Sequence, residues 1–195
     1  MSMTQMAAWS VLLFDITKSR WMIPPAFHVE ICAEIGYIIY YIQSERYGIG
    51  MEKQDNKRLI RMALEAREKA YTPYSGYKVG AALLAKDGTV YTGCNIENAG
   101  YTPTNCAERT AFFKGVSEGE RDFTAIAIVG GYEGKPVDYA YPCGVCRQVM
   151  MEFCDPKTFR VITAISEEDY LEKTLEEMLP YGFGPKNISS GDNLR

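Results

Sequence analysis

The sequence has few features of a secreted, membrane-bound or nucleic-acid-binding protein. Its most apolar stretch, residues 35–42, is far shorter than the roughly 20 residues that cross a bilayer, so we expect no membrane partner. The amino terminus lacks a basic region followed by an apolar run and a cleavage site, which argues against a secretory signal. Lys and Arg total 21 against 25 Asp and Glu, a net charge of −4, and no basic stripe is present to attract nucleic acid.

Histidine is nearly absent as well. The one histidine, His28, lies in an amino-terminal segment that has no catalytic constellation, so we do not expect it to bind a metal. Internal repeats and low-complexity tracts are also missing. The chain has 195 residues, of which 47% are hydrophobic and 24% charged, and this composition predicts one globular domain with an additional segment.

Cysteine is the informative residue that is present. Of the six cysteines, Cys143 and Cys146 form a Cys-x-x-Cys pair, and Cys106 stands in a second short polar segment. Without a secretory signal, this pattern favours metal-bound thiolates in a reduced, cytoplasmic compartment over disulfides. Three thiolates can hold a zinc ion and leave its fourth tetrahedral position open to water. Glu108 lies two residues after Cys106, close enough to handle the protons of that water without being a ligand.

Other interpretations of the cysteines remain open from the residues alone. A structural zinc site would need a fourth ligand, which Cys94 or Cys154 could supply. The three cysteines could instead be buried core residues. A redox role for the Cys-x-x-Cys pair leaves Cys106 and Glu108 without a function. In a catalytic site, the ion and three thiolates would sum to −1, so Arg109 or Arg147 is expected to donate to a thiolate and offset the charge, unless each only makes a surface ion pair.

The order of predicted elements indicates an α/β protein. We expect a mixed sheet with helices on both faces, because strands and helices alternate along the chain. Helices are predicted over residues 54–70, 105–117, 144–154 and 167–179, and strands over 77–85, 89–94, 123–130 and 159–165.

Residues 1–50 differ from the rest, with clustered apolar residues that follow no clean period. We expect an amino-terminal extension of unknown role there, either a dispensable stretch that an early start codon adds or an accessory segment. A catalytic domain is expected over residues 51–185 and a flexible tail over 186–195.

The chain from residue 54 to about 185 resembles the small homotetrameric cytidine deaminases of pyrimidine salvage. Four ordered motifs carry the resemblance: Pro73-Tyr74-Ser75-Gly76-Tyr77-Lys78-Val79-Gly80-Ala81-Ala82, Gly93-Cys94-Asn95-Ile96-Glu97-Asn98-Ala99, Cys106-Ala107-Glu108-Arg109 and Pro142-Cys143-Gly144-Val145-Cys146-Arg147-Gln148. The resemblance implies a three-layer α/β/α sandwich with a mixed sheet of about five strands. It also implies one catalytic zinc ion per subunit on the three cysteines, with Glu108 as the proton carrier.

The same resemblance implies the substrate and its contacts. The expected reaction is hydrolytic deamination of cytidine and 2′-deoxycytidine, with a small nucleoside and no nucleic acid as the partner. Asn95 and Glu97 match residues that hold the ribose, and as alternate residues of an extended segment they face one side; ordinary turn chemistry is the competing role. Further substrate contacts are implied for Ala107, Tyr77 (where the family usually has Phe) and, across subunit interfaces with shared active sites, Tyr101 and Phe183.

Two other functions would fit parts of the pattern. One is deamination of a cytosine nucleoside antibiotic, which would use the same zinc motifs; the motif from Asn95 to Ala99 favours plain cytidine. A polynucleotide deaminase is disfavoured because those enzymes usually carry His where this chain has Cys106. The other is a non-catalytic module that zinc stabilises.

Overall fold

The structure is a computed structural model that describes residues 14–15, 20–21, 48–133 and 137–188. The chain divides into two compact units, Met1–Met51 and Glu52–Arg195. In the first unit, strands β1 (Phe14–Asp15) and β2 (Arg20–Trp21) pair in antiparallel fashion. His28 and the apolar run of residues 35–42 lie outside the described residues, as does the end of the predicted tail from residue 189 on.

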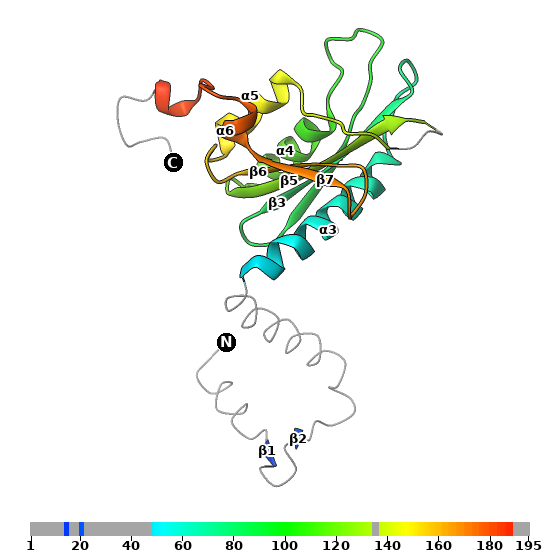
Figure 1. The fold of residues 1–195 in the computed structure, drawn as a ribbon. Helices are drawn as coiled ribbons and strands as arrows, with labels where there is room; N and C mark the ends of the chain where they lie inside the picture. Colours follow the sequence, from blue (N-terminus) through cyan, green and yellow to red (C-terminus); the bar gives the residue numbers. More distant parts are fainter. Residues whose placement is uncertain (1–13, 16–19, 22–47, 134–136, 189–195) are drawn as a thin grey trace. The chain divides into compact units, whose positions relative to one another are not determined.

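A five-stranded mixed sheet forms the centre of the second unit, in the order β4-β3-β5-β6-β7 (Figure 1). Only β5 and β6 run parallel; every other neighbouring pair is antiparallel. The strands are β3 (Tyr77–Ala85), β4 (Val90–Cys94), β5 (Phe123–Tyr132), β6 (Arg160–Ala164) and β7 (Tyr170–Thr174). The sheet and its helices confirm the α/β fold class with a mixed sheet of about five strands.

The alternation of side chains along the strands produces two cores, one on each face of the sheet. Along β3, Ala81, Leu83 and Ala85 belong to one core and Ala82 to the other. Along β5, Ile126 and Ile128 face the first core and Ala127 the second. Successive strand residues point to opposite faces, so nearly continuous apolar sequence is what a sheet covered on both sides requires.

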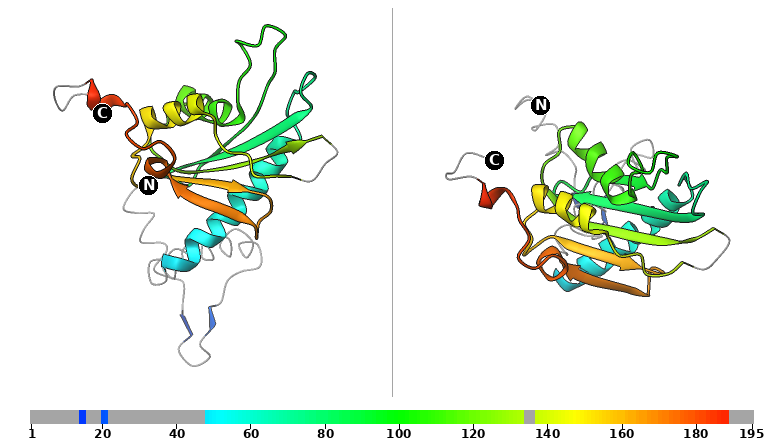
Figure 2. Two further views of the ribbon diagram at one scale, coloured as in Figure 1. Left: turned by 45° about the horizontal axis from the view of Figure 1, so that its top comes forward. Right: turned by 90° about the horizontal axis from the view of Figure 1, so that it is seen from above.

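Helices cover both faces, as Figure 2 shows. Helix α3 (Gly48–Arg67) packs Leu59, Ile60 and Ala63 on one core, whereas α4 (Ala107–Ser117) and α5 (Gly144–Phe153) pack on the other. Helix α3 begins before Met51 and ends before the predicted limit at residue 70. Among the described residues, no helix combines the length and apolarity that a membrane span requires.

Two glycines bring the helices close to the sheet. A methyl group on Gly80 would lie 2.0 Å from the carbonyl oxygen of Ala63 in α3. A methyl group on Gly93 would lie 2.4 Å from the carbonyl oxygen of Ala107, the first residue of α4. Both distances are far inside van der Waals contact, so only glycine lets the two helices pack directly on the strands.

The helix predicted over residues 167–179 is wrong. Residues 170–174 form β7, an edge strand paired with β6, and only Leu175–Met178 are helical, as α6. Thr174 and Glu177 form a capping box that marks the true start of this helix. The acidic residues that suggested an earlier start pair with other elements instead: Glu167 binds Arg61 of α3 at 2.8 Å. After α6 the chain continues to a short 3-10 helix, η3 (Pro185–Asn187).

Candidate active site

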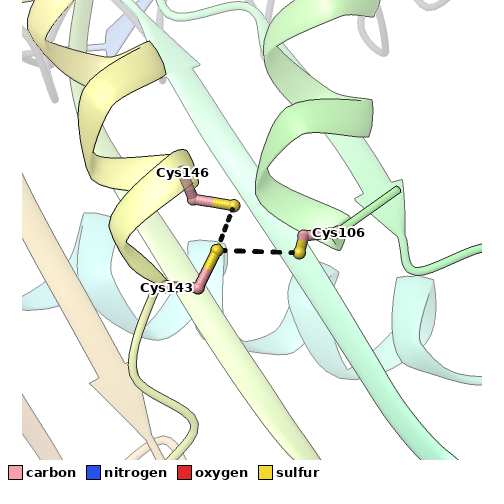
Figure 3. A group of neighbouring side chains, drawn as sticks. All are labelled: Cys106, Cys143 and Cys146. Carbon is pink, nitrogen blue, oxygen red and sulfur yellow. Dashed lines mark hydrogen bonds between the residues drawn. The ribbon is translucent and has the colours of Figure 1, made fainter. Parts of the chain in front are cut away.

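Three cysteine side chains meet where α4 and α5 begin (Figure 3). Cys106 is the N-cap residue of α4, Cys143 is the N-cap residue of α5, and Cys146 lies in the first turn of α5. The Sγ atoms of Cys106 and Cys143 are 3.9 Å apart, and those of Cys143 and Cys146 are 3.5 Å apart. The first turn of α5 thus provides two sulfurs and the facing end of α4 provides the third.

The helix starts favour negative charge at this place. Neither N-cap side chain bonds to its own helix, so the N–H groups of both first turns have no side-chain cap. Such groups carry a partial positive charge that stabilises a thiolate. The local sequence therefore places sulfur where a polar cap such as Ser or Asp would ordinarily stand.

The spacing of the sulfurs fits one zinc ion. Two sulfurs that each lie about 2.3 Å from zinc in tetrahedral geometry are about 3.8 Å apart. The three Sγ atoms here lie within 4.8 Å of one another; Cys143 Sγ is 3.5 Å from Cys146 Sγ and 3.9 Å from Cys106 Sγ. Three sulfur ligands leave one tetrahedral position for another group, as in catalytic zinc sites.

A fourth cysteine does not join this cluster among the described residues. The Sγ atom of Cys94 donates to the carbonyl oxygen of Lys69 at 3.4 Å, and Cys154 is buried in the core below α4 and α5. The metal-binding group consists of Cys106, Cys143 and Cys146 alone within the described part of the chain. A structural zinc site closed by Cys94 or Cys154 therefore has no support in the geometry.

Glu108 lies beside the sulfurs in the first turn of α4 and is only 4% exposed. Burial raises the pKa of its carboxyl group to about 7, and the negative charge of Cys106 acts in the same direction. A carboxyl group with a pKa near neutrality can both accept and release a proton under ordinary conditions. This environment differs from that of a surface carboxylate and is compatible with the proton transfer predicted for Glu108.

Arg109 reaches the cluster from the same turn. Its Nη2 atom donates to Cys106 Sγ at 3.6 Å and to the carbonyl oxygen of Thr104 at 3.3 Å. The neighbouring Cys146 thiol contributes most to lowering the pKa of Cys106 to about 5, and Arg109 lowers it further against the effect of burial. The same interaction with Cys106, together with burial, raises the pKa of Cys146.

Arg147 has different partners. Its Nε atom donates to the carbonyl oxygen of Pro142 at 2.8 Å and its Nη1 atom to that of Met178 at 2.7 Å. Within the described residues it makes no hydrogen bond to a thiolate. The guanidinium group therefore links Pro142, the residue before Cys143, to Met178 at the end of α6. Any offset of the thiolate charge by Arg147 would act through space, without a hydrogen bond.

A cavity of about 340 Å³ opens next to the cysteines. Pockets of about 300–1,000 Å³ hold small molecules, so this one can accept a nucleoside. The predicted residues Tyr77, Asn95, Glu97, Cys106, Ala107, Glu108 and Cys143 all line it. Two thiols, the buried carboxyl group and the candidate sugar contacts, which are far apart in the sequence, therefore face one space. Cys146 does not line the cavity and joins the site through its contact with Cys143.

Asn95 and Glu97 also hold the backbone of the cavity. The Asn95 side chain accepts from Val79 N and donates to the carbonyl oxygen of Tyr77, both at 2.8 Å. Glu97 Oε2 accepts from the N–H groups of Tyr74 and Ser75. The Ser75 side chain, followed by these N–H groups, lowers the pKa of the Glu97 carboxyl group. Their polar groups are thus fixed in place at the cavity, and turn chemistry and substrate contact are compatible at these positions.

Tyr101 and Phe183 do not line the cavity of their own chain. Tyr101 is 79% exposed and Phe183 58% exposed. Tyr101 also adopts a positive φ of 56°, an uncommon conformation for a residue with a side chain. Both aromatic side chains are therefore exposed at the surface. Neither takes part in the cavity of its own chain.

One side of the cavity was not predicted from the sequence. Tyr139, Ala140 and Tyr141 line it from the segment that precedes Pro142 and Cys143. The available signal was position: the two tyrosines stand four and two residues before a metal-binding cysteine. Further lining residues that the sequence did not suggest are Val79, Thr104, Asn105 and Ile128.

The fold and the site together define a zinc-binding hydrolytic enzyme of the α/β class. The model of the cytidine and deoxycytidylate deaminase zinc-binding region matches residues 53–162, and the chain belongs to this family. A protein from Sporosarcina psychrophila called cytidine deaminase is 52% identical over 135 residues, which cover 69% of this chain and 96% of the relative. A second cytidine deaminase, from Halalkalibacterium halodurans, is 51% identical over 135 residues, which cover 69% and 98%.

Solved structures agree with the family. The crystal structure of cytidine deaminase from Burkholderia pseudomallei is 48% identical with a TM-score of 0.59, and the match covers 65% of this chain and 97% of that one. The crystal structure of cytidine deaminase from Mycobacterium tuberculosis is 38% identical with a TM-score of 0.56, over 65% and 95% of the two chains.

Proposed function

We propose that the protein is a zinc-dependent cytidine deaminase that hydrolyses cytidine and 2′-deoxycytidine to uridine and 2′-deoxyuridine, with release of ammonia. The observation that carries this proposal is a cluster of three thiols, two of which line one cavity of about 340 Å³ together with the buried Glu108. The reaction replaces the exocyclic amine of cytosine by oxygen and needs a nucleophile and a proton carrier at one place. It would return pyrimidine nucleosides to the uridine pool, the step known as pyrimidine salvage.

The chain divides this chemistry between its residues. Cys106, Cys143 and Cys146 would hold one zinc ion, which when bound lowers the pKa of water and so supplies a nucleophile near neutral pH. Glu108 carries both protons of the attacking water: it accepts the first and delivers it to N3 of the base, then accepts the second from the hydroxyl group now on C4 and delivers it to the departing amine. Arg109 offsets the negative charge of the thiolates through its contact with Cys106.

The substrate would be held along the other walls of the cavity. Asn95 and Glu97 supply an amide and a carboxylate that suit the hydroxyl groups of a ribose. Tyr77 presents an aromatic ring for the base, and Ala107 lies at the start of α4 beside the thiols. Arg147 supports the site through the backbone of Pro142.

We also propose a homotetramer with shared active sites. Its support is the high exposure of Tyr101 and Phe183, the two aromatic residues that match cross-subunit contacts of the family. Light scattering should give the mass of four chains, and a fully active monomer would contradict the proposal.

A reduced, cytoplasmic setting completes the proposal. In the described part of the chain, Cys94, Cys106, Cys143 and Cys146 are free thiols, which suits a metal site built from thiolates. Fractionation of the source cells should then recover the deaminase activity in the cytoplasm.

One assay tests the activity directly. The purified protein is analysed for zinc, and the change in absorbance is followed in separate reactions with cytidine, deoxycytidine, CMP, cytosine, adenosine and an aminoacyl cytosine nucleoside. We expect about one zinc per chain and turnover of cytidine and deoxycytidine only. A protein with zinc and no turnover of any of these would be a non-catalytic module, and turnover confined to an aminoacyl cytosine nucleoside would indicate an antibiotic deaminase.

A further inference from the structure

One wall of the cavity is held by a tyrosine that belongs to neither the zinc site nor the ribose contacts. We define the pocket wall as residues 138–141, of which Tyr139, Ala140 and Tyr141 line the cavity. We propose that Tyr139 is a positioning residue for the nucleoside, because its hydroxyl group fastens this wall to Asp169 in the turn between β6 and β7. This inference rests on the proposed function, since the wall borders the substrate of that reaction.

The inner end of the pocket wall is fixed on the sheet. The N–H group of Asp138 donates to the carbonyl oxygen of Gly130 at 2.8 Å, in an isolated antiparallel bridge. Ala140 is only 7% exposed and packs directly on β5, since a methyl group on Gly130 would lie 2.6 Å from its Cβ. The alternate residues of the wall, 138 and 140, are therefore anchored by backbone and by packing.

The outer side of the wall depends on Tyr139. Its hydroxyl group donates to Asp169 Oδ1 at 2.5 Å. This bond and burial raise the pKa of Tyr139, so the phenol keeps its proton near neutral pH. The ring of Tyr139 also stacks on Tyr141, with centroids 6.2 Å apart and planes 22° from parallel. The side chain of Tyr141 is 56% exposed, and the stack on Tyr139 restricts the position of its ring.

The turn that receives the bond is itself well anchored. The carbonyl oxygen of Asp169 accepts from the N–H groups of Ile165 and Ser166, at 2.9 and 3.2 Å. The two residues before Asp169 bind helix α3: Glu167 makes two hydrogen bonds to Arg61, and Glu168 pairs with Lys57. Each exposed ion pair is weak alone. The backbone bonds and both pairs nevertheless make the turn a fixed point for Tyr139.

The location of this bond predicts which kinetic constant depends on it. The thiols and Glu108 are held by α4 and α5 and do not need Tyr139. The wall instead borders the space that the nucleoside occupies. Loss of the hydroxyl group should loosen the wall and weaken substrate binding, while the chemical step proceeds with nearly unchanged rate. The KM should therefore rise, and kcat and zinc content should stay nearly constant.

The test compares Tyr139→Phe and Asp169→Ala with the full-length, zinc-loaded wild type. Tyr139→Phe keeps the ring and its stack on Tyr141 and removes only the hydrogen bond. Tyr91→Phe is the matched control, because it deletes a half-buried tyrosine hydroxyl on β4 that does not line the cavity. We measure kcat, KM for cytidine, zinc content and hydrogen exchange of the amides of residues 138–141.

We expect each variant to raise KM about 2- to 10-fold, the range of a single net hydrogen bond, and to speed exchange in the pocket wall. The double variant should be no worse than either single one, because both remove the same bond. Asp169→Asn keeps an acceptor oxygen and should restore most of the affinity.

Unchanged KM and exchange in Tyr139→Phe, or additive losses in the double variant, would overturn the inference. A fall in zinc content or kcat equal to the rise in KM would also overturn it, because that pattern signals general damage. If the wild type fails to deaminate cytidine, the proposed function falls separately, and hydrogen exchange alone decides whether Tyr139 holds the wall.

Discussion

Arg109 Nη2 lies 3.6 Å from Cys106 Sγ, one turn further along the same helix. Three thiolates and a divalent ion carry a net charge of −1, which opposes the formation of an anionic nucleophile. A guanidinium group in contact with one thiolate offsets part of that charge. Arg109 is held in this position by its second bond, to the carbonyl oxygen of Thr104.

Replacing Arg109 by Ala should lower the turnover of cytidine at neutral pH and shift the pH–rate profile to higher pH. The direction follows from charge: without the cation, removing a proton from water at the site becomes harder, so a higher pH is needed. Arg109→Lys should retain part of the activity. Arg121→Ala is the control, because this exposed arginine donates to the backbone oxygens of Val116, in the last turn of α4, and of Glu120, far from the first turn that holds Cys106. An unshifted profile in Arg109→Ala would assign the compensation elsewhere.

Glu108→Gln should keep the fold and the zinc but lose most of the turnover. The amide has nearly the same shape as the buried carboxyl group and cannot carry protons, and such a group typically contributes about 10²–10⁴-fold. Steady-state kinetics with metal analysis measures the effect, and Glu118→Gln at the exposed end of the same helix serves as control. A near-normal rate in Glu108→Gln would exclude the proposed proton carrier.

The sequence predicted the two-sided sheet well because its strands are apolar on both faces. Residues 77–85 were assigned as a strand with the same limits as β3, since only a strand places Leu83 in one core and Ala82 in the other. The edge strand β7 was missed because three of its five residues are exposed, Glu172 and Lys173 among them are charged, and Leu171 and Leu175 fit a helical spacing. Its pairing with β6 is a long-range contact that no local pattern encodes.

At the site, the residues whose chemistry is rare were predictable. Thiols and a carboxylate two residues apart have few other uses. The structure brings Cys106, Cys143 and Cys146 into one cluster, and Cys106, Cys143 and Glu108 line one cavity. The pocket wall was not predictable, because Tyr139 acts through Asp169, a residue that only the β6–β7 turn brings near it. The partners of Arg147 were equally hidden, since Met178 lies in a helix whose place depends on β7.

Zinc removal should lower the melting temperature, because an ion that binds only the folded chain stabilises it by mass action. Cys106→Ser tests this sharply: serine is a good N-cap for α4, so the helix start is kept or improved while a metal ligand is lost. We expect this variant to lose zinc and to melt like the chelated wild type. Cys94→Ser, outside the cluster, should keep its zinc. Full zinc occupancy in Cys106→Ser would contradict the proposed ligand set.

Gly93→Ala should destabilise the protein through α4. The added methyl group would lie 2.4 Å from the carbonyl oxygen of Ala107 and 2.5 Å from the N–H nitrogen of Ala111, so the helix must move. Overpacking of this kind usually costs about 1–3 kcal/mol. Chemical denaturation measures the loss, and Gly144→Ala is the control because its methyl group meets nothing within 4 Å. Equal stability of the two variants would show that α4 does not depend on this close approach.

The amino-terminal extension should be dispensable for deamination. The family model begins to match at residue 53, and a relative that is 52% identical is covered over 96% of its length by 135 residues of this chain. The first compact unit ends at Met51, although α3 begins at Gly48, so a truncation should keep residues 48–195 rather than begin inside the helix. We expect this shortened protein to keep its zinc content, oligomeric mass and kcat/KM for cytidine.

A second truncation, to residues 60–195, serves as the contrasting control. It removes the buried Asn56, which donates to Glu172 at 2.6 Å and accepts from Arg160 at 2.8 Å, and it should therefore lower the melting temperature. Should the 48–195 protein lose zinc or change its oligomeric mass, the extension is structural, and the catalytic domain extends into the first 50 residues.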